Sequence, residues 1–450
     1  MFRKGIGPIL LIQAVLLIGC ASHRIDTSWP APRPLGDGVK AYRPSTSPPE
    51  GTSVEGVPKV EGPLTLAQAL LLALVHNPEL KAFAWDVRAA EARALQAGVS
   101  PNPEFEAEVE EFGGAGERGG FDGAAATFSL SQALELGKRS KRVAVADLEG
   151  KSAGWDYETK RIEAFSSVVK AFIDVLTAQE NLALAGESVQ LSERLLETVQ
   201  KLHEIGKAPA LEIAKAKVSI ASSRIEHGNA ARNLVAAKQR LAAIWGGGAD
   251  SVDELSGDFL AVASAPPLAD LETRLSQNPD LARYEDELRL RRAVVNLEKA
   301  NRVPDLTVRG GVQRFGDADD TTFVVGVGIP LPIFDRNQGS VAAARFEERK
   351  ALENGRAASL RLRTELTDAY QRLSAAHAEI NSLNKEVIPQ AQSAFQNAEE
   401  FYRMGRFSFL EVLDAQRTLY DARARLVEVL SEYHQSVAEI ERLTGQTLNP

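Results

Sequence analysis

The chain has 450 residues, of which 44% are hydrophobic and 25% charged, and its formal net charge is −9 at pH 7. This length and composition allow a large buried core, whereas the acidic balance argues against a nucleic-acid-binding surface. Cys20 is the single cysteine, which excludes an internal disulfide, so the fold must be held by packing.

Residues 1–19 are typical of a secretory signal peptide. A basic start precedes an apolar run over residues 6–19, which is too short to span a bilayer. The run ends at Leu-Ile-Gly-Cys, which resembles the motif that lipidates bacterial lipoproteins, so Cys20 is expected to carry palmitate in the mature protein. Ala21 then resembles the sorting pattern for outer-membrane delivery. The alternative is an ordinary signal peptide with an incidental buried cysteine, which a lone thiol in an exported protein disfavours.

Residues 20–62 are rich in proline, serine and glycine. Such a composition predicts a lipid-anchored, extended tether with little core of its own. After the signal, no apolar run reaches the length of about 18 residues that a helical span requires. Any further membrane crossing must therefore use β-strands.

The rest of the chain states one pattern twice, with a period of about 200 residues. Asn-Pro-Glu-Leu at 77–80 returns as Asn-Pro-Asp-Leu at 278–281, and Ile-Gly-Lys at 205–207 returns as Met-Gly-Arg at 404–406. Each half has the order helix, strand pair, very long helix, return helix. We therefore expect two repeats, residues 63–246 and 247–450, related by pseudo-symmetry of the kind that makes rings and tubes.

Each repeat is expected to contain a β-hairpin, at about 103–134 and 304–332. Apolar and acidic residues alternate strictly over 105–110, as in a strand with one wet face. The strand lengths approach those that tilted strands need to cross a bilayer, although a pair of soluble hairpins packed on a helix is the alternative. Four strands leave unpaired edges, so strands that span would require the chain to oligomerise.

A very long helix is expected after each hairpin. Residues 138–202 contain no proline, and residues 336–403 contain only Pro389. At about 1.5 Å per residue each would reach roughly 100 Å, and the leucine spacing over 191–202 is typical of a coiled coil. Glycines mark candidate bends or breaks in these helices and the chain reversals that follow them: Gly150, Gly154, Gly186 and Gly355 for the former, Gly206 and Gly405 for the latter.

Over residues 64–446 these features together resemble the outer-membrane efflux protein family typified by TolC. Two segments are similar to its CzcC-type subfamily, which serves heavy-metal efflux: residues 102–139, and Ile-Pro-Leu-Pro-Ile-Phe-Asp-Arg-Asn-Gln-Gly at 329–339. The resemblance implies a membrane β-barrel plus all-α fold. Three chains would form a 12-stranded outer-membrane barrel continuous with a long periplasmic α-helical coiled-coil barrel.

The resemblance also implies a function and partners. The homotrimer would be the passive exit duct of a tripartite system, and the subfamily implies heavy-metal cations as its cargo. It would dock on a periplasmic adaptor (membrane fusion) protein and an inner-membrane RND pump. It would be lipid-anchored in the bacterial outer membrane and extend into the periplasm, without enzymatic activity or a cofactor. The alternatives are a multidrug or small-molecule duct of the same family, or a lipid-anchored coiled-coil tether with no pore.

The resemblance places a gate near the periplasmic end of the second repeat. Tyr402 matches a gate tyrosine, and Glu411 and Asp414 fall where the family's aperture carboxylates lie, on one helix face. In a trimer they would form stacked acidic rings that favour cations, whereas the alternative is a solvated helix face. Phe407 stands where the family has a gate arginine, and Glu212 is the weaker counterpart in the first repeat.

The alternating strand suggests a second acidic surface. If its apolar side meets lipid, the lumen is lined by Glu106, Glu108 and Glu110, with Arg309 offsetting part of their charge. Other patterns fail: the glycine-rich stretch 114–119 lies in a hairpin tip with no helix after it, so it does not predict a dinucleotide site. Asp317, Asp319 and Asp320 lack calcium-loop spacing, and the scattered histidines predict no metal site.

Overall fold

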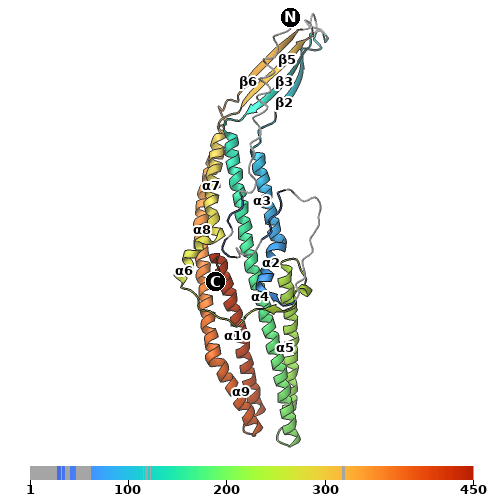
Figure 1. Ribbon diagram of the computed structural model, residues 1–450, viewed down its shortest axis with the longest axis vertical. Helices are drawn as coiled ribbons and strands as arrows, with labels where there is room; N and C mark the ends of the chain where they lie inside the picture. The colour runs from blue at the N-terminus through green and yellow to red at the C-terminus, as the bar shows by residue number, and fades with distance from the viewer. Residues whose placement is uncertain are drawn as a thin grey trace. The chain divides into compact units, whose positions relative to one another are not determined.

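A computed structural model of the chain describes residues 28–31, 33–35, 41–46, 62–114, 116, 120–121, 123–316 and 320–448 (Figure 1). The described residues fall into two compact units, each assembled from separate stretches. The first, called here the sheet unit, comprises Asp86–Trp155 and Arg283–Arg356 with the described part of Met1–Pro30. The second, the helical unit, comprises the described parts of Ala31–Trp85, Asp156–Ala282 and Ala357–Pro450.

The sheet unit contains a four-stranded antiparallel sheet. Its strands, in the order β2-β3-β5-β6, are β2 (Glu104–Glu110), β3 (Ala125–Leu134), β5 (Leu306–Phe315) and β6 (Thr321–Gly328). Phe105 pairs with Leu130, and Phe128 pairs with Val312. Opposite residues of antiparallel strands share a face, so the alternating pattern gives the sheet one apolar and one polar face. Both strand pairs expected from the sequence form.

Helices make up most of the described chain. They are α2 (Leu66–His76), α3 (Pro78–Ala97), α4 (Lys138–Glu204), α5 (Ala210–Ala243), α6 (Leu268–Arg274), α7 (Pro279–Ala300), α8 (Gln338–Ser382), α9 (Ile388–Arg403) and α10 (Phe409–Thr444). In the helical unit, the two-residue strands β1 (Leu64–Thr65) and β4 (Leu255–Ser256) pair in parallel. None of the helices in the described ranges is both long and apolar enough to cross a membrane.

The asparagines of the two Asn-Pro pairs make the same two kinds of hydrogen bond in the helical unit. The Asn77 side chain accepts a hydrogen bond from the Leu80 amide at the start of α3 and donates one to the Ile244 carbonyl, both at 2.8 Å. Asn278 accepts from the Asp280 amide at the start of α7 and donates to the Leu443 carbonyl at 3.0 Å. Each asparagine therefore caps one helix and satisfies a carbonyl at the end of a return helix.

The expected helix breaks occur at one place only. α4 continues through all three of its glycines, so the expectation of breaks there was wrong, and Gly355 likewise lies within unbroken α8. The segment with Pro389 does interrupt the second long helix, where a π-helical turn at Leu383–Val387 separates α8 from α9. Proline removes an amide donor and crowds the preceding turn, which accounts for this interruption.

Two of the α4 glycines create room for the N-terminal segment. An added Cβ at Gly150 would lie 2.5 Å from Ser28 Oγ, and one at Gly154 would overlap the Ser28 carbonyl and lie 2.8 Å from Pro30 Cδ. Within the helical unit, Leu35 is fully buried in the core with Leu64, and its amide donates to the Gly445 carbonyl. Leu35, within the segment 20–62 that was expected to have little core of its own, thus packs into the core of the helical unit.

Replacing Gly154 by alanine should displace residues 28–30 without breaking α4. A glycine-to-alanine change within a helix normally stabilises by about 0.5–1 kcal/mol, but here the new methyl overlaps Ser28. We expect faster proteolytic removal of the N-terminal segment, measured by limited trypsin digestion, with helix content unchanged by circular dichroism. Gly228→Ala is the matched control, because its nearest heavy atom, Arg232 Nη1, would be 3.7 Å away. Equal digestion of both variants would contradict this account.

Candidate functional site

Two helical hairpins of the helical unit end in loops of related sequence. α4 reverses into α5 at Gly206, and α9 reverses into α10 at Gly405, with φ of +72° and +75°. These are left-handed conformations that glycine adopts without steric cost. The predicted positions of both reversals are confirmed. We call residues 202–216 and 402–416 the hairpin ends.

The two return helices begin differently, and this sets the role of each glutamate. Ser408 caps α10, and Glu411 completes a capping box by accepting the Ser408 amide at 2.6 Å and its hydroxyl at 3.1 Å. Pro209 caps α5 and has neither an amide hydrogen nor a hydroxyl to offer. The carboxylate of Glu212 is therefore not used in a capping box.

Glu212 instead accepts a hydrogen bond from Tyr402, with 2.7 Å between Tyr402 Oη and Glu212 Oε2. The Tyr402 ring is 5% exposed and lies 5.6 Å from the ring of Phe409. Burial, followed by the bond to Glu212, raises the pKa of the Tyr402 phenol, so this group remains a proton donor at neutral pH. One hydrogen bond thus joins the hairpin end of the first half to that of the second.

The predicted gate residues lie close together along the chain but differ in their contacts. Glu411 and Asp414 are both exposed, in the first two turns of α10. The Glu411 carboxylate is occupied by capping, whereas that of Asp414 makes no hydrogen bond or ion pair with the described residues. Phe407 packs edge-on against Phe401 at 5.1 Å.

In the sheet unit, strand β3 buries its polar side chains and exposes its apolar ones. Thr127 and Ser129 on β3 are 5% and 2% exposed, whereas Phe128 between them is 49% exposed. On β6, Phe323 and Val325 are 84% and 81% exposed. A water-soluble sheet buries its apolar side, so this sheet has the inverse arrangement. We call the bare side, which also carries Phe105, Val109, Leu130, Val312 and Val327, the apolar face.

The predicted acidic strand face is held by one arginine. Arg309 Nη2 lies 3.3 Å from a carboxylate oxygen of Glu106 and 3.7 Å from one of Glu108, and Arg309 Nε donates to Ser129 Oγ at 2.9 Å. Glu110 lies on the same face of β2 without an ion pair among the described residues. The expectation that Arg309 offsets part of the acidic charge is confirmed.

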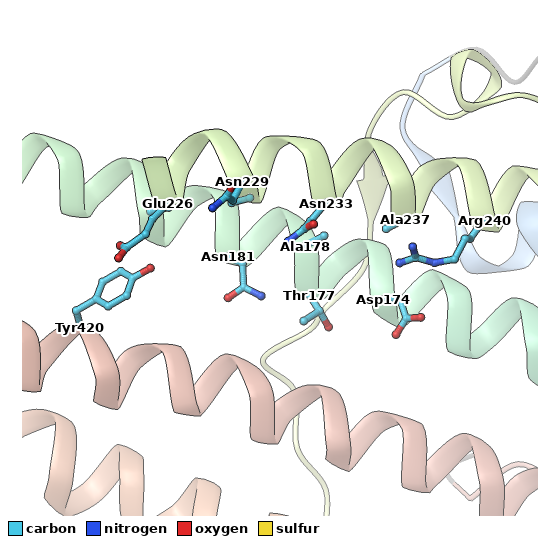
Figure 2. Close-up of a pocket in the computed structure, with 12 residues that line it drawn as sticks. Asp174, Thr177, Ala178, Asn181, Glu226, Asn229, Asn233, Ala237, Arg240 and Tyr420 are labelled. Atoms are coloured by element: carbon cyan, nitrogen blue, oxygen red, sulfur yellow. The ribbon is translucent and has the colours of Figure 1, made fainter. Parts of the chain in front are cut away.

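A polar cavity of about 500 Å³ lies in the helical unit between α4, α5 and α10 (Figure 2). Burial raises the pKa of Asp174, against the attraction of Arg240, and burial with the nearby charge of Glu226 raises that of Tyr420. In Figure 2 Asp174 and Glu226 occupy opposite ends of the cavity. No ion can therefore bridge these two carboxylates, and the described residues contain no cluster of three metal-ligating side chains.

Comparison with known proteins decides among the functional classes. The family model for outer membrane efflux proteins matches residues 69–247 and 271–446. The chain belongs to this family. A member of this family is a channel component of the outer membrane and not an enzyme, so the predicted family, localisation and lack of enzymatic activity are confirmed.

Three matches place the protein within the family. The cobalt-zinc-cadmium resistance protein CzcC of Cupriavidus metallidurans is 34% identical over 92% of this chain and 99% of its own. The pyoverdine export outer membrane protein OpmQ of Pseudomonas aeruginosa is 27% identical over 97% of this chain and 96% of its own. The crystal structure of VceC from Vibrio cholerae, with a TM-score of 0.72 and 21% identity, covers 85% of this chain and 97% of its own, which shows a shared fold.

The sequence ranks Glu212 below Glu411, whereas in the structure Glu212 makes the contact between the two hairpin ends. Glu212 aligns with Glu411 across the duplication, and the signal that it is free for another contact is proline at 209 where the second half has serine at 408. The predicted lipidation residue Cys20 lies outside the described residues, as do Asp317 and Asp319 in the hairpin turn.

The two carboxylates of the second hairpin end should respond differently to neutralisation. Glu411→Ala removes half of a capping box, which should weaken the first turn of α10 by on the order of 1 kcal/mol. Asp414→Ala removes no hydrogen bond or ion pair to the residues that the structure describes and should leave this turn unchanged. Hydrogen exchange of the amides of residues 409–412 measures the difference. Equal exchange in both variants would show that Glu411 does not cap α10.

Proposed function

We propose that this outer-membrane efflux protein is the passive exit duct of a tripartite system that exports heavy-metal cations. The chain-long similarity to a cobalt-zinc-cadmium resistance protein carries this proposal. We also propose that the mature protein starts at a lipid-bearing Cys20, and that residues 63–246 and 247–450 are two repeats of one unit. An inner-membrane RND pump and a periplasmic adaptor would supply the energy and the connection to the pump.

The unpaired strands favour a closed trimer. β2 and β6 form the edges of the sheet, and each has a neighbour on one side only. Unpaired backbone groups are costly in lipid, so strands in a bilayer must form a closed barrel. Three copies of the sheet would give twelve strands and no edge, with the apolar face toward lipid and Glu106, Glu108 and Glu110 toward the lumen.

In the helical unit, one side of α5 is likewise left uncovered by the described residues. Leu211, Val218 and Ile225 on α5 are 64%, 66% and 64% exposed and recur every seven residues. A seven-residue apolar repeat is the seam of a coiled coil. Since α4 covers another side of α5, as their contacts in the hairpin-end core show, the seam is available to a helix of a second copy. This arrangement supports a continuous ring of helices.

We assign metal cations as the cargo because the acidic face of the sheet agrees with the similarity to a cobalt-zinc-cadmium resistance protein. Rings of carboxylates raise the local concentration of cations and repel anions. The similarity to a pyoverdine exporter keeps a small-molecule duct as the second candidate. A tether without a pore is the third candidate. In that case the polar face of the sheet would not line a conducting channel.

The metal assignment predicts a selective loss of tolerance. Deleting the gene should sensitise its host to divalent cobalt, zinc or cadmium and leave tolerance to hydrophobic drugs unchanged, because the pump would lose only its own exit. Growth across a metal panel and a drug panel, with and without the wild-type gene restored, measures this. Sensitivity to drugs alone would move the protein to the small-molecule branch, and unchanged tolerance throughout would contradict an export role under these conditions.

The bond between the hairpin ends predicts a closed resting gate. Tyr402→Phe keeps the ring against Phe409 but removes the hydroxyl that donates to Glu212, so single-channel conductance in a planar bilayer should rise. Tyr420→Phe is the matched control, because this tyrosine lies on α10 outside the hairpin ends, whereas Tyr402 lies at the end of α9. Equal conductance of Tyr402→Phe and the wild type would refute the gate, and no conductance from any form would favour the tether.

A further inference from the structure

At one end of the strands the sheet is followed by an apolar segment and a basic cluster. Leu134 pairs with Leu306 and Thr307 pairs with Gly328, so β3 and β6 end, and β5 begins, at this end of the sheet. The next residues lead into the helices, and an ion pair of 2.9 Å between Lys138 and Asp305 joins two of these connections. We call residues 134–142 and 328–336 the junction.

The apolar part of the junction is the Ile-Pro-Leu-Pro-Ile-Phe segment at 329–334. Leu331, Ile333 and Phe334 are 74%, 60% and 91% exposed, although side chains of this kind are usually buried in a water-soluble protein. Pro330 and Pro332 have no amide hydrogen, and the Ile333 amide donates to the Leu331 carbonyl at 2.8 Å. The segment thus exposes apolar side chains with few unsatisfied amide donors, which suits the boundary of an apolar phase.

The basic part of the junction lies at a helix N-terminus, where positive charge is electrostatically unfavourable. Lys138, Arg139, Lys141 and Arg142 occupy the start of α4, and its first turn contains no acidic residue. A helix N-terminus carries partial positive charge and favours acidic side chains. Two of the four cations brace the junction, Lys138 through Asp305 and Arg142 through Glu135. The other two need a different explanation.

Arg139 and Lys141 are exposed and have spare donors. Arg139 Nη1 donates to Ser100 Oγ at 2.6 Å, which leaves most of its guanidinium hydrogens available. Lys141 makes no hydrogen bond or ion pair with the described residues. Arg336 adds a third exposed cation directly after the apolar segment. Positive charge gathers here on a chain whose net charge is −9, so the junction is complementary to an anionic partner.

We propose that the junction binds the headgroup layer of a bilayer that contains anionic phospholipid. Leu331 and Phe334 enter the boundary between headgroups and acyl chains, while Arg139 and Lys141 contact lipid phosphates. This rests on the proposed membrane position of the sheet, because its apolar face continues into the segment at 329–334. Continuity with that face, together with the positive charge, identifies a lipid surface as the occupant.

Fluorescence quenching by brominated lipids separates this inference from its premise. Full-length Phe334→Trp and Phe323→Trp would each be reconstituted in bilayers with bromines near the headgroup or deep in the acyl chain. Both sites are highly exposed, so tryptophan should be tolerated, and the quenching of wild-type tryptophans is subtracted. We expect shallow bromines to quench Trp at 334 and deep bromines to quench Trp at 323. No quenching at 323 refutes the membrane sheet, whereas quenching at 323 with none at 334 refutes only the junction proposal.

Headgroup preference tests the basic part. Brominated phosphatidylglycerol should quench Phe334→Trp with about 25-fold higher apparent affinity than brominated phosphatidylcholine, about fivefold for each of the two basic side chains Arg139 and Lys141. Adding Lys141→Gln should lower this ratio to about fivefold, and 0.5 M salt should reduce it. Lys217→Gln on α5 is the control and should leave it unchanged. Equal affinity for the two lipids in the parent variant, or a ratio that Lys141→Gln does not lower, would overturn the assignment of Lys141.

Discussion

The contacts of Arg309 make the inverted sheet possible. A polar face can be covered only if its groups find hydrogen-bond partners, and this side chain supplies donors to Ser129, Glu106 and Glu108 together. Without Arg309, the neighbouring carboxylates on β2 would repel one another, close to hydroxyl groups that are almost fully buried. Gly311 completes the arrangement, because a Cβ there would lie 2.8 Å from the Ser129 Cβ. The chain can therefore turn its apolar side chains outward, which is the property that an outer-membrane location demands.

In the helical unit, one local motif, Asn-Pro at a helix start, is used twice. Asn77 and Asn278 each cap a helix and bind the end of a return helix, so a short sequence repeat closes both halves. The rest of that unit depends on long-range packing, which includes Leu35 and the contact of Tyr433 with residue 263 through two hydrogen bonds of 2.8 and 2.9 Å. The Asn-Pro motif therefore recurs where each return helix ends, and long-range packing holds the rest of the unit together.

Most of the fold could be predicted because its signals are local. Period-2 alternation on β2, the absence of proline in α4 and the reversing glycines each act within a few residues. Gly150 and Gly154 misled because a glycine that admits a neighbouring chain looks the same in sequence as one that bends a helix. The bond between Tyr402 and Glu212 spans 190 residues. Its existence depends on tertiary distance, so the sequence singled out the tyrosine but not its acceptor.

The difference between Pro209 and Ser408 gives the two hairpin ends different contacts. Serine commits the glutamate three residues later to capping, and proline releases its counterpart for a contact with the other half. If both halves had serine, Glu212 would be drawn to its own helix start and Tyr402 would lose its acceptor while remaining buried, at a cost of about 1–3 kcal/mol. If both had proline, α10 would lose its capping box. One substitution between otherwise similar loops therefore lets one hairpin end be held by its own cap and the other be held by its neighbour.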